Sequence, residues 1–157
     1  MLTCTPRLEG SRLELNLAIE NPLTAAIWVA ESLPVPAGSG VTSSSRAAYV
    51  RPYMGGVLIS REYLPVPEHL DVEAPERPEW VRVEPGEVHR CTLELPWPLV
   101  ARDPYDAKAL AAPGPSRKLW CGLGYVVDAG RGPPRDPKTQ SRAVVELKGL
   151  RHPDSSG

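Results

Sequence analysis

Hydrophobic and polar residues alternate along several short stretches of this chain. Residues 13–19 read Leu-Glu-Leu-Asn-Leu-Ala-Ile, with an apolar side chain at every second position. Because successive side chains of a β-strand point to opposite faces, this stretch predicts a strand with one buried face. Asn21-Pro22 has turn chemistry, and a second strand is expected over about 25–31.

The same strand–turn–strand pattern recurs along the chain. The further predicted pairs of strands cover 48–52 with 57–63, 80–84 with 87–95, and 118–127 with 141–149. The pattern predicts an all-β fold of about eight strands in four hairpins. We expect a two-sheet antiparallel immunoglobulin-like β-sandwich, with an eight-stranded barrel as the alternative.

The apolar faces of these strands predict one shared core. Its expected members are Leu15, Leu17, Cys91, Leu93, Leu123, Val145 and Leu147. One domain over 1–150 accounts for the pattern, and the polar residues 151–157 are expected to form a flexible C-terminal tail.

One short helix is predicted between the third and fourth hairpins, near 104–111. Asp103 is a suitable N-cap, Pro104 fits the first helical position, and Pro113 ends the helix. Two stretches without alternation are expected to be proline-rich or flexible loops, namely 37–45 and the acidic segment 65–79.

A short motif closes three of the predicted units. Leu-Pro-Val-Pro begins at residues 33 and 64, and Leu-Pro-Trp-Pro begins at residue 95. Proline cannot donate to a strand ladder, so we interpret the motif as the point where pairing ends. The identical hairpin direction favours a common rim for the three copies. A polyproline II surface for an aromatic groove is the alternative.

Composition and charge exclude some classes of protein. The chain has 157 residues, 19 of them proline, and a net charge of −1, which argues against general binding to nucleic acid or anionic membranes. Acidic residues gather over 62–87 and basic residues from 115 onward. We interpret both as solvated surfaces. An acidic loop that meets a basic face on another molecule is the alternative.

The first residues contain no apolar run typical of a secretory signal, and no stretch reaches the length of a membrane span. We therefore expect a soluble cytoplasmic protein with reduced thiols.

Signatures of catalysis are missing from the sequence. It has no Gly-x-Ser-x-Gly elbow, no phosphate-binding loop and no His-Glu-x-x-His motif. The segment 122–127, Gly-Leu-Gly-Tyr-Val-Val, lies inside a predicted strand, so its glycines are expected to let a neighbouring backbone or a large side chain approach. We predict that the protein is not an enzyme and needs no cofactor.

His89, Cys91 and Cys121 form the one metal-like combination in the sequence. His89 and Cys91 share a strand face, and Cys121 could lie opposite them. A tetrahedral zinc site needs a fourth ligand, which is not evident. We therefore predict buried, reduced thiols without a metal, with zinc or a Cys91–Cys121 disulfide as alternatives.

Stiffly held apolar residues are the best candidates for binding another molecule. Trp97 lies between two prolines and Trp80 begins a strand, while Leu64, Pro65 and Pro67 belong to the second proline motif. A rigid aromatic anchor loses little entropy on binding. Trp97 could instead form a lid over the end of the core.

Three functions fit these observations. We favour a non-catalytic β-sandwich that binds another protein, as a component of a larger assembly and with homo-oligomers allowed. A carbohydrate or small-ligand binding module is the second hypothesis. A protease inhibitor that presents the loop 64–79 is the third.

Overall fold

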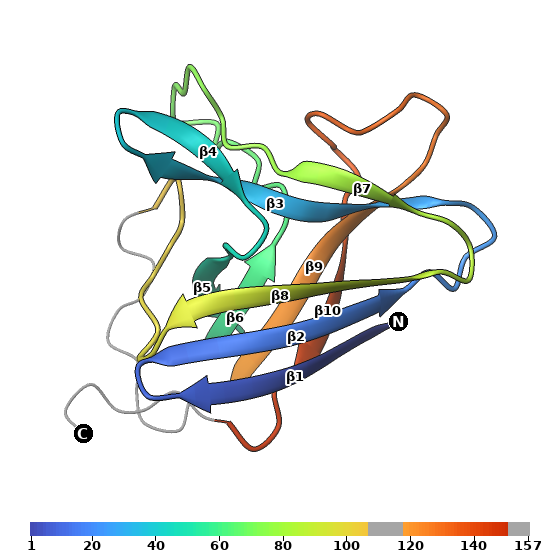
Figure 1. The fold of residues 1–157 in the computed structure, drawn as a ribbon. Helices are drawn as coiled ribbons and strands as arrows, with labels where there is room; N and C mark the ends of the chain where they lie inside the picture. Colours follow the sequence, from blue (N-terminus) through green and yellow to red (C-terminus); the bar gives the residue numbers. More distant parts are fainter. Residues whose placement is uncertain (107–117, 151–157) are drawn as a thin grey trace.

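The computed structural model describes residues 1–106 and 118–150 of the chain. Within these ranges the chain forms β-strands and no helix (Figure 1). The strands are β1 (Leu2–Glu9), β2 (Arg12–Glu20), β3 (Ile27–Ala37), β4 (Gly40–Ser44), β5 (Tyr49–Tyr53), β6 (Gly56–Arg61), β7 (Glu79–Val83), β8 (Val88–Pro96), β9 (Leu119–Val127) and β10 (Ser141–Glu146). The all-β class predicted from the sequence is confirmed for these residues.

The strands form two sheets. The smaller sheet has three strands in the order β1–β2–β8, and the larger has seven. The main path of the larger sheet is β4–β3–β9–β6–β5, with β10 paired to β9 and β7 paired to β3. Neighbouring strands are antiparallel except for β6 and β9, which run parallel.

One hydrophobic core lies between the two sheets. Alternate residues of β2, from Leu13 to Ile19, are fully or almost fully buried and share one cluster with Leu119 and Leu123 of β9. Each fully buried leucine contributes roughly 2 kcal/mol relative to an exposed one. The predicted core set is confirmed for Leu15, Leu17, Leu93, Leu123 and Leu147, while Cys91 and Val145 pack against the cluster and are partly buried.

Two of the four predicted hairpins are present. β5 pairs with β6, and β9 pairs with β10, both antiparallel. The first and third predicted hairpins are wrong, because β2 and β3 lie in different sheets, as do β7 and β8. In both cases the turn carries the chain from one sheet to the other.

Asn21 explains why these two turns cross between the sheets. Its side chain is buried and donates to the carbonyls of Ala25 at 2.9 Å and Val83 at 3.0 Å. Its backbone N–H donates to Glu87, and its carbonyl accepts from the N–H of Gly86. Asn21 therefore ties together the β2–β3 and β7–β8 connections at one end of the fold.

The first proline motif does not end strand pairing, contrary to the prediction. Leu33–Pro36 lies inside β3 and pairs with β4 in a hairpin whose register begins at Ala37 and Gly40. Donors alternate sides along a strand, so Pro34 and Pro36 both direct their missing N–H away from β4. The second motif does follow the end of pairing, at Arg61, whereas pairing ends within the third motif, since Leu95 and Pro96 still pair with Leu13 and Arg12 of β2.

Two strands fall outside the predicted set, which raises the number above eight. β1 includes the N-terminal residues and pairs with β2 over its whole length. β4 lies within 37–45, a stretch whose lack of alternation predicts a flexible loop. Gly38 adopts a φ of 59°, which favours glycine and allows the tight turn into β4.

The predicted helix near 104–111 lies largely in 107–117, outside the described residues, as does the predicted tail 151–157. Residues 103–106 are not helical, and the Asp103 carboxylate accepts a hydrogen bond from the N–H of Tyr105 at 2.9 Å. No helix in the described part of the chain has the length and apolar character that a membrane span requires.

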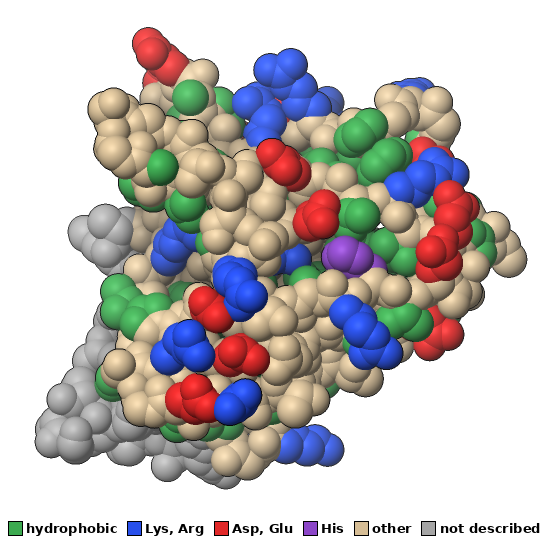
Figure 2. Space-filling model, in the orientation of Figure 1, with side chains coloured by type: hydrophobic (Ala, Val, Ile, Leu, Met, Phe, Trp, Pro, Cys, Tyr) green, Lys and Arg blue, Asp and Glu red, His purple; other side chains and the backbone are tan. Residues whose placement is uncertain are grey.

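Positive and negative side chains are interspersed over the outer face of β1, β2 and β8, as Figure 2 shows. Ion pairs join Arg12 to Glu9 at 3.5 Å and Arg46 to Glu94 at 2.6 Å. Exposed pairs of this kind contribute about 0–1 kcal/mol each. This face has the mixed charge of a solvated surface.

Candidate functional site

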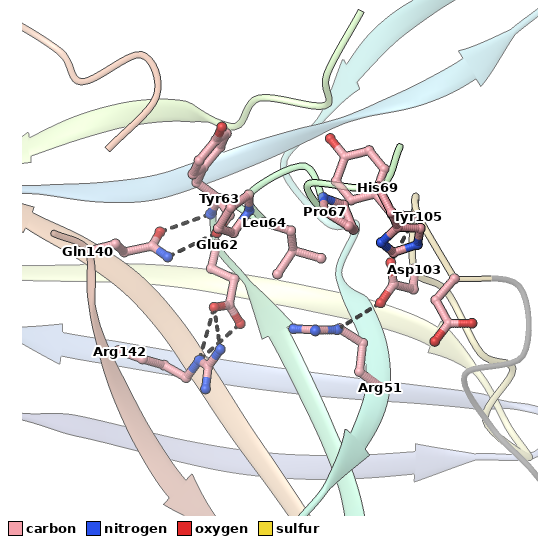
Figure 3. A pocket seen from close by; sticks show the side chains of 12 residues that line it. Arg51, Glu62, Tyr63, Leu64, Pro67, His69, Asp103, Tyr105, Gln140 and Arg142 are labelled. Carbon is pink, nitrogen blue, oxygen red and sulfur yellow. Dashed lines mark hydrogen bonds and ion pairs between the residues drawn. The ribbon is translucent and has the colours of Figure 1, made fainter. Parts of the chain in front are cut away.

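A cavity of about 750 Å³ lies at the outer side of the larger sheet, beside the ends of β5 and β6 (Figure 3). Four segments that are far apart in the sequence line it. The lining residues are Arg51, Glu62, Tyr63, Leu64, Pro65, Pro67, His69, Asp103, Tyr105, Asp106, Gln140 and Arg142.

Glu62 and Arg142 form the first ion pair in the wall of the cavity (Figure 3). Arg142 donates through Nη2 to Oε1 of Glu62 at 2.6 Å, and through Nε to both carboxylate oxygens at 3.0 Å. The Ser60 hydroxyl donates to the same carboxylate at 2.5 Å. The side chain of Glu62 is 2% exposed and that of Arg142 is 31% exposed. The buried carboxylate therefore fixes the arginine, and the arginine is the part that a ligand can reach.

Two glycines of β9 leave the space that this pair occupies. A Cβ atom on Gly124 would lie 2.7 Å from Cβ of Glu62 and 2.4 Å from Oε1 of Gln140. A Cβ atom on Gly122 would lie 3.3 Å from Cδ of Arg142. The prediction that these glycines admit large side chains is confirmed.

Arg51 and Asp103 form a second ion pair. Arg51 Nε donates to Asp103 at 3.0 Å, and the carboxylate is again the more buried partner, at 10% exposure against 31% for the arginine. Because Asp103 also accepts from the N–H of Tyr105, its position is fixed from two sides. Two arginines thus present N–H donors in fixed orientations at one cavity.

The remaining wall combines apolar and aromatic side chains with the polar residues His69, Asp106 and Gln140. Gln140 donates to the carbonyl of Tyr63 at 3.0 Å and accepts from the N–H of Tyr63 at 2.9 Å.

Leu64 packs with Leu33 and Tyr49 in a small second cluster. The first two proline motifs therefore lie side by side, and their leucines share one cluster.

The acidic loop between β6 and β7 is tied to the body of the protein. Arg77 binds Asp136 through Nε at 2.7 Å, and the Tyr49 hydroxyl donates to Glu76 at 2.8 Å. Burial and this hydrogen bond raise the pKa of Tyr49 well above its ordinary value. The N–H of Glu76 donates to the Tyr105 hydroxyl at 3.1 Å. These contacts hold the loop beside the cavity.

Three of the five predicted anchor residues line this cavity, namely Leu64, Pro65 and Pro67. Trp80 and Trp97 are not among its lining residues. Trp97 is half-buried and packs against the main core, as a lid would. Trp80 is half-buried on β7, and its indole Nε1 has no hydrogen-bond partner among the described residues.

The predicted thiol and histidine residues lie elsewhere, between the two sheets. Cys91 and His89 are half-buried, and Cys121 is fully buried. The neighbour of Cys121 is Cys4, whose sulfur accepts a hydrogen bond from the Cys121 thiol. All three cysteines are free. Among the described residues, no group of three His, Cys, Asp or Glu side chains could hold a metal ion.

Sequence reasoning missed the charged residues of the cavity. Arg51, Glu62, Asp103 and Arg142 come from different elements, and no local spacing connects them. The glycines at 122 and 124 were the available signal, because two glycines in one strand mark a close approach. The carboxylates of Glu62 and Asp103 are occupied by arginines, so the arrangement suits the binding and orientation of a polar ligand.

Comparison of the chain with protein-family models, curated proteins and solved structures finds no match.

Proposed function

We propose that this protein is a non-catalytic immunoglobulin-like β-sandwich that binds another protein, and that the cavity beside β5 and β6 receives a segment of that partner. The cavity itself is the observation that supports the proposal most. It combines two fixed arginines with tyrosine, leucine and proline side chains in a volume of about 750 Å³. Polar donors set in an apolar wall are typical of sites that recognise a specific ligand.

The rigidity of the site also supports a binding role. Arg51 and Arg142 are each held by a more buried carboxylate, and Pro65 and Pro67 have restricted backbone torsions. A site whose side chains are already ordered loses less conformational entropy when it binds. The partner segment would contact the arginine N–H groups through carbonyl or carboxylate oxygens, and the prolines and tyrosines through apolar side chains.

A random peptide library displayed on phage tests this proposal. The wild-type protein selects peptides, and their affinity is then measured for two variants. Pro65→Trp places a large ring at an exposed residue of the cavity, whereas Val41→Trp places the same ring at a residue of β4 that is 74% exposed and outside the cavity. We expect at least a tenfold loss of affinity for Pro65→Trp and no change for Val41→Trp.

Thermal unfolding of both variants confirms that they are folded. Equal affinities of the selected peptides for the wild type and Pro65→Trp would show that the cavity is not the site of peptide binding.

The volume of the cavity favours one second candidate function. Pockets for small molecules commonly measure about 300–1,000 Å³. The rings of Tyr63 and Tyr105 at this cavity could contact a sugar or another small polar ligand. A glycan array distinguishes the two proposals. A saccharide that binds the wild type and fails to bind Pro65→Trp would favour the small-ligand function.

A further inference from the structure

A second site lies on the opposite sheet, along the free edge of β8. This strand ends the smaller sheet and faces β3 of the larger sheet across the fold (Figure 1). The N–H of Glu94 is directed away from β2 and donates to the carbonyl of Arg46 at 2.9 Å. Because backbone groups alternate sides along a strand, Arg90 and Thr92 direct their N–H and C=O groups the same way. Among the described strands, β8 pairs with β2 only. Arg90 and Thr92 therefore offer backbone groups to a further strand.

A groove of about 240 Å³ follows this edge. One side consists of β8 residues, including Arg90 and Thr92, and the other side consists of Ser45 and Arg46, with Glu31 of β3. The groove is therefore bounded by both sheets and lies next to the unpaired backbone groups.

Arg61 of β6 lies beneath this groove. It has no exposed surface, and it donates through Nη1 to the carbonyl of Ser45 at 2.7 Å and through Nε to the carbonyl of Ala30 at 2.8 Å. Ser45 and Cys91 both line the groove. Burial lowers the pKa of Arg61, and the nearby Cys91 thiol partly offsets this decrease. Nη2 of Arg61 has no acceptor among the described residues. A buried guanidinium with a free donor is costly unless an acceptor reaches it.

His89 contributes a second buried polar atom to the same place. Its side chain shares the inward face of β8 with Cys91, and its Nε2 has no partner among the described residues. Burial lowers the pKa of His89, the Glu31 charge opposes this, and the smaller effect of the Arg61 charge lowers it further. Two polar atoms without partners, on two different sheets, therefore lie near one groove.

The charge around the groove is positive. Arg46 is paired with Glu94, but Arg90 has no ion pair among the described residues. Glu31 is the acidic residue of the groove. Its single negative charge is outnumbered by the positive charges of Arg61 and Arg90. A negatively charged group complements this balance.

We propose that the edge of β8 binds an extended segment of another protein as an additional strand, and that an aspartate or glutamate of this segment points inward to Arg61 and His89. The backbone of the segment pairs with Arg90 and Thr92, as in other cases of strand addition at a free edge. Its alternate side chains enter the groove, where the carboxylate accepts from Nη2 of Arg61 and from Nε2–H of His89. The two buried polar atoms thereby gain their missing partner.

Two fluorescent peptides of the sequence Thr-Val-Xaa-Val-Thr, blocked at both ends, test the proposal on the full chain. Xaa is glutamate in one peptide and glutamine in the other, and the flanking residues favour extended structure. Fluorescence anisotropy measures the affinity of each. We expect the glutamate peptide to bind at least tenfold more tightly than the glutamine peptide, and His89→Leu to reduce this ratio.

A pair of variants at one position tests the backbone part. Thr92→Pro removes the outward N–H that the added strand requires, whereas Thr92→Val keeps this N–H. Both variants remove the Thr92 hydroxyl, which donates to Asn16 at 2.9 Å. We expect Thr92→Pro to abolish binding and Thr92→Val to retain it. Both variants are tolerable, because neither removes a backbone hydrogen bond between β8 and β2, and both lose the same side-chain bond to Asn16.

Three results would overturn the proposal: equal affinity for the two peptides, unchanged binding by Thr92→Pro, or no saturable binding of the glutamate peptide at millimolar concentration. Pro65→Trp serves as an independent control. It should leave binding at β8 unchanged, so that the two proposed sites succeed or fail separately.

Discussion

Arg142 reaches across Gly122 of the neighbouring strand to bind both carboxylate oxygens of Glu62. A side chain at Gly122 would obstruct this path, since its Cβ would lie 3.3 Å from Cδ of the arginine. The carboxylate is almost completely shielded from water, so the arginine is its charge partner as well as its hydrogen-bond donor. The pair therefore links β10 to the segment that follows β6, across the central strand of the larger sheet.

Removal of the arginine from this pair should destabilise the protein strongly. Arg142→Met leaves the buried carboxylate of Glu62 without its cation, and the loss of one partner of a buried pair costs about 3–5 kcal/mol. Urea unfolding measures the change in the free energy of unfolding. The double variant Glu62→Gln with Arg142→Met should recover much of the loss. Arg7→Met, which removes an exposed ion pair, is the control and should change stability by less than about 1 kcal/mol.

The glycine at 124 should not tolerate a methyl group. Gly124→Ala places Cβ 2.7 Å from Cβ of Glu62, so that the strands or the side chains must move apart. Such overpacking costs about 1–3 kcal/mol. Gly40→Ala is the matched control, because its nearest neighbour would lie at 3.9 Å and its φ is not in the left-handed region. Thermal unfolding should show a lower melting temperature for Gly124→Ala only, and equal melting temperatures would contradict the close approach at β9.

The three thiols should react with iodoacetamide at different rates. The pKa of Cys121 is raised because its thiol donates to Cys4 and is buried, and the pKa of Cys4 is lowered by the same hydrogen bond. Burial raises the pKa of Cys91, although the nearby Arg61 opposes this. Since the thiolate is the reactive form, Cys4 should be labelled first and Cys121 last.

Mass spectrometry of digested samples measures these rates in the native protein. Labelling in guanidinium chloride, where the three environments become similar, is the control. Labelling of Cys121 as fast as Cys4 in the native protein would contradict the contact between them.

Asp128 should make stability depend on pH in the acid range. Its pKa is lowered because its carboxylate accepts from the N–H of Gly130, from Trp28 Nε1 and from Arg82. A lowered pKa in the folded state means that this stabilisation is present above the unfolded-state value of about 3.9, and is lost as pH falls through the folded-state value.

The variant Asp128→Asn tests the expected direction of this pH dependence of stability. It should be less stable than the wild type at pH 6, and the difference should shrink as the pH falls below about 4. Urea unfolding at a series of pH values measures it, with Asp71→Asn in the exposed acidic loop as the control. A difference that stays constant down to pH 2 would show that the charge of Asp128 does not contribute.

The alternation of residues was sufficient to predict the strands that bury one face. In β2 and β9, every second residue enters the core, and the sequence shows this period directly. It could not show which strands pair. A strand–turn–strand pattern is the same whether the turn closes a hairpin, as between β5 and β6, or crosses between sheets, as at Asn21. The contact that decides the second case joins Asn21 to Val83, far away in the sequence.

The residues of the candidate site could likewise be predicted from the sequence only in part. Pro65 and Pro67 were identified because proline restricts the chain wherever it occurs. Arg51 and Arg142 carried no local signal, since their partners Asp103 and Glu62 are separated from them by long stretches of sequence. The position of the first proline motif inside β3 depends on register, because Pro34 and Pro36 are tolerated only where their missing donors face away from β4.

The central position of β9 determines the order in which a growing polypeptide can acquire its structure. β1, β2 and β8 all precede residue 97, so the smaller sheet can be complete while synthesis continues. The larger sheet cannot, since β9 alone joins β3, β6 and β10, and its parallel register pairs Val57 with Leu119. Until β9 leaves the ribosome, the hairpins β3–β4 and β5–β6 remain separate and expose their apolar faces. During this interval the exposed apolar faces make the nascent chain most prone to aggregation.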